Sequence, residues 1–298
     1  MEKIPTVCIV GSINMDLTIR TDSIPVQGET VLGSDFATYP GGKGANQAVA
    51  AARMGAQVHL IGAVGDDSFG KSLVAHLQAE GIHMESITTV SDVTTGVANI
   101  ILSEADNRII VAPGANDFVL PSLVDQYEEQ IKKSDIVLLQ LEIPVHTVLY
   151  VLEVANKHMV PVIVNPAPYQ KLSEELLMKA TYLTPNEIEV EALGKEVDVA
   201  SLEDKLIITK GEHGVQYFAD QIKKNVPSFQ VDVKDTTGAG DTFNGVLAAQ
   251  LAEGVPFEQA IKFANAAAAL SITRLGAQGG MPTKKEVSAF IKASVNTQ

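Results

Sequence analysis

The sequence predicts an α/β protein with a doubly wound, mostly parallel sheet and a small antiparallel β lid. Short, continuous apolar runs recur along the chain, and helical patterns separate one run from the next. Continuous apolar runs are typical of strands that are buried on both faces, as in parallel sheets. Two other stretches alternate polar with β-branched residues, which is typical of strands with one exposed face. The chain is therefore expected to build one wound sheet with a smaller β element beside it.

The candidate strands and helices follow each other in order. The apolar runs span residues 6–11, 58–64, 135–141, 160–165, 181–185 and 205–211. The helical patterns between them predict helices over about 44–54, 69–80, 121–131, 145–157, 173–180 and 186–194. Two further helices are expected near the C-terminus, from Ala239 to about Glu253 and over the alanine-rich segment 257–276.

The two alternating stretches are residues 15–39 and 94–112. Turn signals divide each of them, which predicts short antiparallel strands outside the main sheet. We interpret them together as one small lid over the core. Because no internal repeat or linker is visible, we expect a single domain over residues 1–298 with this lid as an appendage.

Composition excludes several classes of function. Lys and Arg total 22 against 36 Asp and Glu, so the formal net charge is −14. An acidic surface repels phosphate backbones and anionic lipid, so we expect neither nucleic-acid binding nor a basic membrane anchor. No apolar stretch approaches the ~20 residues of a membrane-spanning helix. The same charge raises the question of how an anionic substrate would be bound.

The remaining bulk features are consistent with a cytoplasmic protein. The single cysteine, Cys8, lies in an apolar run, so a disulfide framework is impossible and a buried, inert thiol is expected. The N-terminal residues lack the apolar core and cleavage site of a signal peptide. The six histidines show no spacing typical of metal ligands.

Polar side chains follow several of the candidate strands. Asn14 and Asp16 come after the first strand, Glu142 after the run 135–141, and Asn165 after the run 160–165. Asn186 and the turn Lys210–Gly214 follow later strands. Ligands of open α/β sheets bind beyond the carboxyl ends of the strands. Each residue alone could be a cap, but carboxylates and amides gathered at one edge favour a polyol or sugar site.

A glycine-rich segment, Tyr39–Gln47, leads into a predicted helix. It contains Gly41, Gly42 and Gly44 beside Lys43 and Asn46. Glycines allow positive φ or a close approach of the backbone to a ligand. The spacing is neither that of a P-loop nor that of a dinucleotide fingerprint.

A second glycine-containing segment, Asp235–Gly245, opens the helix that begins near Ala239. The free N–H groups of a helix start form an anion site, to which the helix dipole adds partial positive charge. Plain N-capping is the alternative, but it does not require Asp235 and Asp241 six residues apart around Gly238–Gly240.

This combination describes phosphoryl transfer to an alcohol. The helix N-terminus would neutralise charge on the transferring group while Asp241 accepts the proton of the hydroxyl and aligns its oxygen. Mg²⁺ carried by the nucleotide would add positive charge.

Over nearly its whole length, the sequence resembles the ribokinase family (PfkB carbohydrate kinases). Both family signatures are present, as GGKGANQA and DTTGAGDTFNG. Shorter matching motifs are GSINMD (11–16), QLEIP (140–144), NPAP (165–168), TPNE (184–187) and GAQ (276–278).

The resemblance implies roles for individual residues. The positions matching sugar contacts are Asn14, Asp16, Gly42, Lys43, Asn46 and Glu142. Asp241 matches the catalytic base, and the anion hole matches Gly238, Ala239 and Gly240. The positions matching nucleotide contacts are Asn186, Thr209, Lys210, Gly211, Glu212, His213, Gly214, Gly240 and Asn265. An activating potassium site, largely of backbone oxygens, matches Asp235, Thr237, Ser271, Arg274, Gly276 and Gly280.

The resemblance also implies ATP, Mg²⁺, K⁺ and a homodimer formed through the lid. The expected activity is ATP-dependent phosphorylation of the primary (5-) hydroxyl of D-ribose. Alternatives are a kinase of fructose, 2-keto-3-deoxygluconate, deoxyribose or a nucleoside, or a non-enzymatic sugar or nucleotide sensor. The intact Asp241 argues against a sensor, because a binding protein needs no base. A phosphate site made of backbone N–H groups would also reconcile a nucleotide with the acidic surface.

Overall fold

The centre of the computed structural model, which describes residues 4–103, 106–219 and 221–295, is a six-stranded sheet in which every pairing is parallel. Its order is β10-β9-β8-β1-β4-β5. The predicted doubly wound, mostly parallel sheet is thus confirmed. The strands are β1 (Thr6–Val10), β4 (Gln57–Gly65), β5 (Ile87–Val90), β8 (Ile136–Leu139), β9 (Val162–Val164) and β10 (Tyr182–Leu183).

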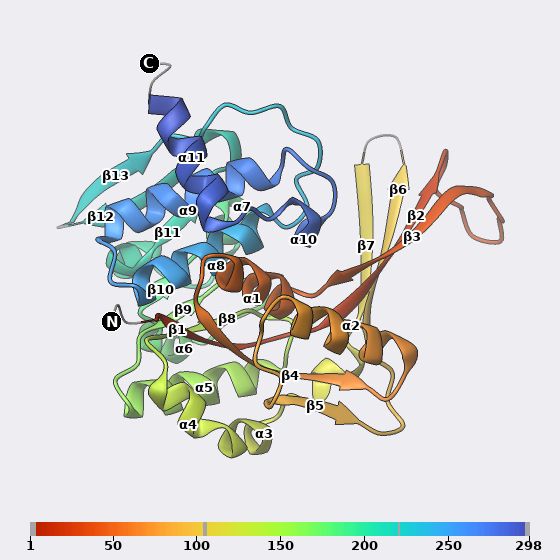
Figure 1. Cartoon of the computed structure of the whole chain (residues 1–298), viewed down its shortest axis with the longest axis horizontal. Helices are drawn as coiled ribbons and strands as arrows, with labels where there is room; N and C mark the ends of the chain where they lie inside the picture. Colours follow the sequence, from red (N-terminus) through yellow and green to blue (C-terminus); the bar gives the residue numbers. More distant parts are fainter. Residues whose placement is uncertain (1–3, 104–105, 220, 296–298) are drawn as a thin grey trace.

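Helices cover both faces of this sheet (Figure 1). One face carries α1 (Lys43–Arg53), α2 (Ser68–Ala79), α8 (Ala239–Ala252) and α9 (Phe257–Ser271). The other carries α3 (Pro121–Gln126), α4 (Glu128–Lys133), α5 (Val145–Lys157) and α6 (Glu174–Lys179). In β1, Val7 and Ile9 belong to the first core cluster, whereas Cys8 and Val10 belong to the second. Burial on both faces explains why the strands are continuously apolar.

A three-stranded antiparallel sheet extends the central one. It comprises β11 (Ile207–Thr209), β12 (Val215–Ala219) and β13 (Ile222–Val226). Two parallel bridges, Leu183–Leu206 and Asn186–Thr209, link its first strand to the end of β10. The run 205–211 was correctly predicted as a strand. The hairpin of β12 and β13 was not, because β13 is exposed along most of its length and carries no buried apolar run.

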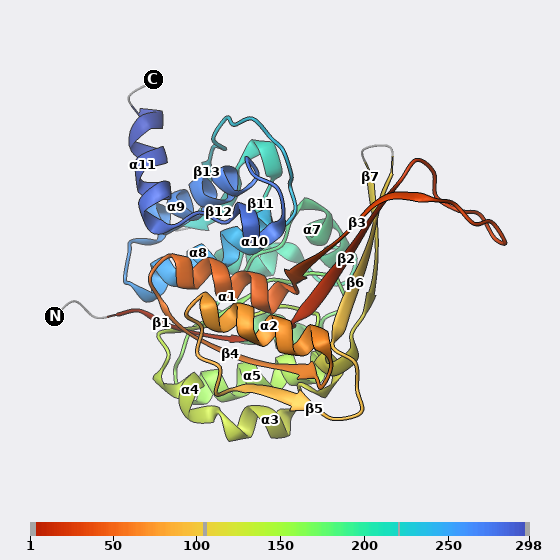
Figure 2. The same cartoon turned by 45° about the vertical axis from the view of Figure 1, so that its right-hand side comes forward.

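The two alternating segments form a separate four-stranded sheet that projects from the body (Figure 2). Its strands are β2 (Asn14–Thr21), β3 (Gly33–Gly41), β6 (Gly96–Ser103) and β7 (Asp106–Ala112). Each hairpin is antiparallel as predicted, but the hairpins join through a parallel pairing of β2 with β6. Residues 104–105 of the predicted segment lie outside the described residues. That this sheet acts as a lid stays a prediction.

Several element boundaries differ from prediction. The helix expected over 121–131 is broken at Tyr127, whose φ of −122° and ψ of 19° separate α3 from α4. The helix expected over 257–276 ends at Ser271, because the carbonyl of Ile272 accepts N–H groups from Lys234 and Asp235 instead of continuing the helix. Strand β5 was not predicted. Nor were three further helical elements: the short α10 (Ala277–Gly280), α11 (Lys284–Val295) and the 3₁₀ turn Gly114–Phe118.

Two other elements complete the described chain. Helix α7 (Glu187–Leu193) agrees with the predicted helix at 186–194, and the segment after it carries a 3₁₀ turn, Val199–Lys205. Within the described residues, no helix combines the length and apolar character that crossing a bilayer requires.

Helices α1 and α8 cross at very close range, and Gly245 makes this possible. A Cβ at Gly245 would lie 2.3 Å from the carbonyl oxygen of Gln47 and 2.7 Å from the Cβ of Ala50. Backbone atoms cannot move away independently of their helix, so any larger residue must push α1 and α8 apart. This contact holds the start of α1 against the start of α8.

We predict that Gly245→Ala lowers the free energy of unfolding by about 1–3 kcal/mol, because the added methyl group overpacks the helix crossing. Thermal unfolding followed by circular dichroism should show a lower Tm. Gly279→Ala is the matched control, since no atom of the described residues lies within 4 Å of its added Cβ. Equal melting temperatures for the two variants would contradict this account of the crossing.

Candidate active site

The candidate site lies at the carboxyl ends of the central strands. From β1 the chain winds outward to β4 and β5, then returns to β8 and winds the other way to β9 and β10. The winding direction therefore reverses beside β1, where crevices form in open α/β sheets. The first turn of α8 lies at this edge, because Gly238 and Asp241 line one pocket with Asn165 and Asn186, which follow β9 and β10.

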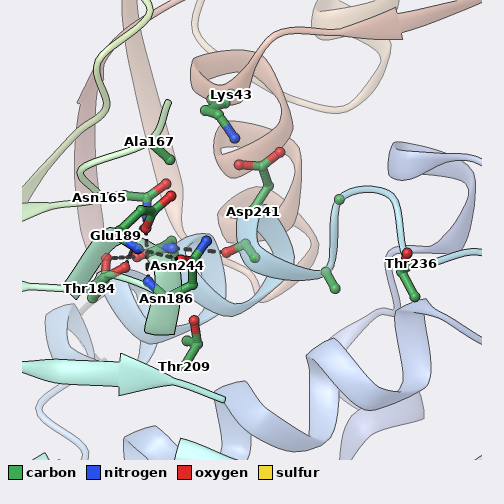
Figure 3. A pocket seen from close by; sticks show the side chains of 13 residues that line it. Lys43, Asn165, Ala167, Thr184, Asn186, Glu189, Thr209, Thr236, Asp241 and Asn244 are labelled. Atoms are coloured by element: carbon green, nitrogen blue, oxygen red, sulfur yellow. Dashed lines mark hydrogen bonds between the residues drawn. The ribbon is translucent and has the colours of Figure 1, made fainter. Parts of the chain in front are cut away.

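A pocket of about 140 Å³ opens at this place (Figure 3). It is bounded by the ends of β9, β10 and β11, by Lys43 at the start of α1, and by the first turn of α8. Nearly all of its side chains are polar. Its lining residues are Lys43, Asn165, Ala167, Thr184, Asn186, Glu189, Thr209, Thr236, Gly238, Ala239, Gly240, Asp241 and Asn244.

Asp241 is buried in the first turn of α8, and both of its carboxylate oxygens are hydrogen-bonded. Asn46 donates from Nδ2 to Oδ2 over 2.9 Å, and Gln47 donates from Nε2 to Oδ1 over 3.0 Å. The helix dipole also favours negative charge at this position. Each carboxylate oxygen has more than one acceptor position, so Asp241 retains the capacity to accept a further hydrogen bond from a ligand hydroxyl.

The backbone before Asp241 is the segment that the sequence predicts to bind an anion. Gly238 caps α8 in the left-handed conformation, with φ 77° and ψ 3°. A Cβ there would lie 2.8 Å from the Cβ of Ala277, so this turn needs glycine twice over. Among the described residues, no atom lies within 4 Å of a Cβ built on Gly240, so the helix start faces open space. Within the described residues, the N–H of Ala239 donates to the carbonyl oxygen of Thr236 over 3.3 Å, which leaves the N–H groups of Gly240 and Asp241 for an anion.

Glu142 gathers the residues predicted to bind sugar. Its Oε2 accepts hydrogen bonds from Ser12 Oγ over 2.5 Å, from the backbone N–H of Lys43 over 3.0 Å and from Asn14 Nδ2 over 3.5 Å. Asn116, which the sequence analysis missed, fixes Asn14 by donating from Nδ2 to its Oδ1 over 2.7 Å. No sequence signal distinguished Asn116, because it follows no strand of the main sheet.

Gly41 and Gly42 bring the start of α1 against β2. A Cβ at Gly41 would lie 2.3 Å from Oδ1 of Asp16, and a Cβ at Gly42 would lie 2.6 Å from the backbone nitrogen of Asn14. Gly42 also has a φ of 88°, which disfavours any other residue. The sequence prediction of a close backbone approach is correct here, although the neighbour that requires it is the protein itself.

The electrostatics of Asp16 are unusual. Burial, together with the nearby Glu142 and Asp241, raises the pKa of this carboxyl to about 7. Lys43 opposes them. Asp16 is therefore poised to change charge near neutrality.

Lys43 is the cation at the centre of this acidic edge. Burial by itself lowers the pKa of Lys43, but the surrounding carboxylates outweigh burial and raise its pKa above the usual value. Those carboxylates are Asp241, Glu142, Glu189 and Asp16. The lysine is thus held charged within the pocket.

On the far side of the pocket, Asn186 begins α7 with a capping box. Its Oδ1 accepts the N–H of Glu189, and Glu189 Oε2 accepts the N–H of Asn186, both over 2.8 Å. Burial raises the pKa of Glu189, partly offset by the Asn186 N–H and by Lys43. Glu189 was missed by the sequence analysis, although an acidic residue three positions after a capping Asn was a usable signal.

Of the other predicted nucleotide residues, Thr209 and Gly240 line the pocket and the rest do not. Lys210 pairs with Glu187 over 3.5 Å, and Glu212 and His213 are exposed on the 3₁₀ turn Gly211–His213. Gly214, which closes this turn, adopts a φ of 86°. Asn265 lies on α9, and its Nδ2 donates to the carbonyl oxygen of Pro227 over 2.8 Å.

The residues predicted to hold potassium come together from two loops. Asp235 accepts the N–H of Thr237 at Oδ1 over 2.9 Å and the N–H of Gly276 at Oδ2 over 2.8 Å. Burial alone would raise the pKa of Asp235, but these hydrogen bonds outweigh burial and lower its pKa. A Cβ at Gly280 would lie 2.3 Å from the carbonyl oxygen of Ser271.

Arg274 shares this loop, but its guanidinium points elsewhere and pairs with Glu286 on α11 over 2.7 Å. Any contribution of Arg274 to a cation site would therefore come from its backbone.

One other group of possible metal ligands occurs within the described residues. His59, His83 and Glu85 place their ligand atoms within 4.8 Å of one another, a proximity that sequence spacing did not reveal. The two imidazole rings are stacked, with centroids 4.7 Å apart and planes inclined by only 20°. Nitrogen lone pairs lie in the ring plane, and one ion cannot lie in two nearly parallel planes. The rings as placed do not converge on a metal.

Known proteins resemble this chain in both sequence and structure. A pfkB family carbohydrate kinase model matches residues 5–284. A ribokinase of Bacillus subtilis (strain 168) is 48% identical over 289 residues, covering 96% of this chain and 99% of that protein. The structure of a Thermotoga maritima ribokinase has a TM-score of 0.88 and 38% identity, covering 97% of this chain and 100% of that chain.

An Arabidopsis thaliana ribokinase, solved in complex with ribose and ATP, has a TM-score of 0.91 and 32% identity, covering 97% of this chain and 99% of that chain. The family resemblance expected from the two glycine-containing signatures is confirmed. The chain belongs to the pfkB family of carbohydrate kinases.

Proposed function

We propose that this protein is an ATP-dependent kinase that phosphorylates the primary (5-) hydroxyl of D-ribose. One observation carries the proposal: a buried, doubly hydrogen-bonded Asp241 lies in the first turn of a helix whose N-terminus faces open space, beside an edge of carboxylates and amides. The Arabidopsis relative, solved with ribose and ATP, supports both substrates.

In the proposed reaction Asp241 accepts the hydroxyl proton as the oxygen bonds to the γ-phosphorus, and ADP leaves. The backbone N–H groups of Gly238, Ala239 and Gly240 stabilise the charge that develops on the transferring phosphoryl group. Lys43, held charged by its carboxylate neighbours, adds positive charge on the sugar side. Because phosphoryl transfer has a loose transition state, a carboxylate is a sufficient base.

The sugar would be held by its hydroxyl groups. Asn14, Asp16, Asn46 and Glu142 offer amide and carboxylate oxygens, and Gly42 and Lys43 bring the backbone close. Carboxylates bind vicinal hydroxyl groups without requiring a charged substrate. This set supports a small polyhydroxylated sugar.

The nucleotide would occupy the other end of the pocket, along Asn186, Thr209 and the turn Lys210–Gly214, with Asn265 nearby on α9. Glu189 offers a buried carboxylate to this pocket, and an oxygen donor that leaves room for water suits Mg²⁺. Bound there, Mg²⁺ would neutralise phosphate charge. An oxygen-rich fit of this kind supports Mg²⁺ as the second cofactor.

A monovalent cation such as K⁺ would occupy the paired loops around Asp235. The donor set consists of this ionised carboxylate and of backbone oxygens from Thr237, Ser271, Arg274, Gly276 and Gly280, and backbone carbonyls are typical K⁺ ligands. Bound there, the cation would add positive charge behind the first turn of α8.

We further propose a cytoplasmic homodimer formed through the four-stranded sheet. The sheet exposes large apolar side chains on both faces: Ile109 and Tyr39 share the face of Asp16, whereas Phe36 and Ile110 lie on the opposite face. Exposed apolar surface of this extent marks an interaction site. The cytoplasm supplies ATP, and a buried free thiol such as Cys8 suits a reducing compartment.

Release of ADP with a panel of sugars tests the function. We expect strong turnover with D-ribose and weaker turnover with fructose, 2-keto-3-deoxygluconate, deoxyribose and nucleosides. In Asp241→Asn, kcat should fall roughly 10²–10⁴-fold, because the base is removed. Sugar binding, measured by calorimetry, should survive in that variant. Strong turnover on another sugar with none on ribose would refute the substrate, and normal turnover of Asp241→Asn would refute the base.

The raised pKa of Asp16 makes sugar binding pH-dependent. Below about pH 7 the carboxyl becomes protonated and loses acceptor capacity, so the KM for ribose should rise several-fold between pH 8 and pH 6. A KM that is flat over this interval would contradict the assignment.

The same shift affects stability. A carboxyl whose pKa is higher in the folded than in the unfolded chain favours folding at low pH, and this contribution is lost between about pH 4 and pH 7. Asp16→Asn should therefore raise Tm by a few degrees at pH 8 and by less at pH 5, while sugar affinity falls.

Light scattering tests the dimer. Ile110→Glu should weaken self-association at least tenfold, because a charge replaces an apolar contact at the sheet. Met178→Glu changes an exposed apolar side chain on α6 in the same way and should leave the mass unchanged. A monomeric wild-type protein, or equal masses for both variants, would refute the interface.

A further inference from the structure

We propose that Gln278 is a positioning residue that holds the carboxylate of Asp241 in place by acting through Asn46. The inference deepens the proposed function and rests on it, because it assigns a task to a residue that does not line the pocket and reaches Asp241 only through Asn46. Gln278 lies on the short helix α10, remote in sequence from both partners. In the sequence, Gln278 belongs to the motif GAQ (276–278), which assigns it no role.

A chain of hydrogen bonds joins Gln278 to Asp241. The Nε2 of Gln278 donates to Oδ1 of Asn46 over 2.8 Å, and the Nδ2 of Asn46 donates to Oδ2 of Asp241 over 2.9 Å. At the other end, Nε2 of His76 lies 2.7 Å from Oε1 of Gln278. The chain therefore runs from α2 through α10 and α1 to the start of α8.

The direction of this chain follows from chemistry. An ionised carboxylate only accepts hydrogen bonds, so Asn46 must turn its NH₂ group toward Asp241. The Oδ1 of Asn46 then needs a donor, which obliges Gln278 to present its NH₂ group. The Oε1 of Gln278 in turn requires a proton on Nε2 of His76. One ionised carboxylate thus fixes two amide orientations and one histidine tautomer.

A second chain reaches the other oxygen of Asp241. Gln140 donates from Nε2 to Oε1 of Gln47 over 2.6 Å, and Gln47 donates from Nε2 to Oδ1 of Asp241 over 3.0 Å. The Nε2 of Gln47 also reaches Oδ1 of Asn165 over 3.2 Å. The two oxygens of Asp241 are therefore held from two sides, and Gln278 controls one of them.

Burial makes the first chain consequential. Gln278 is only 5% exposed and Asn46 only 6%, so neither amide can turn to water if its partner is lost. The backbone of Gln278 is itself clamped, because Arg53 donates from one NH group to the carbonyl oxygens of Gln278 and Met281, each over 2.7 Å. Arg53 is in turn paired with Glu80. These contacts fix the position of the Gln278 side-chain amide.

Substitutions at Gln278 act on this chain in distinguishable ways. Gln278→Leu removes the donor to Asn46, so the Asn46 amide loses its orienting partner. Gln278→Glu keeps the size but replaces the donor with an acceptor, which favours the reversed Asn46 amide and turns Oδ1 of Asn46 toward Asp241. That reversal sets two acceptors against each other, so Gln278→Glu should be the more damaging.

The experiment compares Gln278→Leu and Gln278→Glu with Gln250→Leu in the full-length protein. Gln250 is an equally buried glutamine, 4% exposed, on the same helix as Asp241 but outside both chains. The measurements are kcat, the KM values for ribose and ATP, and Tm.

We expect kcat to fall roughly 10- to 100-fold in the Gln278 variants, because a misplaced reacting group has costs of this size. The KM for ATP should change less than threefold.

A readout without turnover completes the test. In ¹⁵N-labelled protein the Asn46 side-chain amide protons should exchange slowly with solvent and lose that protection in Gln278→Leu but not in Gln250→Leu. His76→Gln, which restores an N–H donor to Gln278, should retain more activity than His76→Leu, and this pair decides the question if the Gln278 variants fail to fold.

The possible outcomes separate the two proposals. Equal losses of kcat and Tm in Gln278→Leu and Gln250→Leu, with unchanged Asn46 protection, would overturn the positioning role. A wild-type protein that turns over none of the sugars would overturn the proposed function instead, and the amide exchange would still report on the chain from Gln278 to Asn46.

Discussion

The structure depends on the burial of one carboxylate, Asp241. A buried charge is costly unless hydrogen bonds satisfy it, and here two amides do so from the first turn of α1. For those amides to reach, α1 and α8 must approach until Gly245 touches the backbone of Gln47. The glycines at the start of α1 and before α8 follow from the same requirement. The anion site, the sugar edge and the helix crossing are thus consequences of one buried charge.

The central sheet was predictable from sequence, because strands buried on both faces leave continuous apolar runs such as 6–11 and 135–141. Strand β13 and helix α11 were not, since their exposed faces carry ordinary polar residues. The glycine-containing segments 39–47 and 235–245 and the polar residues at the strand ends predicted the position of the candidate site. Asn116 and Gln47 were missed because their contacts, with Asn14 and Asp241, span more than a hundred residues of chain. Glu189 was missed although its capping box with Asn186 is local.

Charge in this molecule is arranged locally. The net charge of −14 gives the surface no general attraction for anions. Around Lys43, four carboxylates converge instead and hold the lysine charged. Burial and two of these carboxylates, Glu142 and Asp241, raise the pKa of Asp16. Such a cluster suits a neutral polyol on one side and cations on the other. A nucleotide then needs only helix N–H groups and bound metal to offset its phosphates.

The position of Asp16 has a consequence for how this framework can diversify. Asp16 belongs to β2, which leaves the body of the protein and pairs only with strands of the projecting sheet, whereas Asp241 belongs to a helix packed into the core. Under the proposed function, part of the sugar recognition therefore lies on the projecting sheet, whereas the base and the proposed sugar contact Asn46 lie together in the core. Selection for a different sugar can rework β2 and β3 while α8 is inherited unchanged, which allows one scaffold to serve a lineage of carbohydrate kinases.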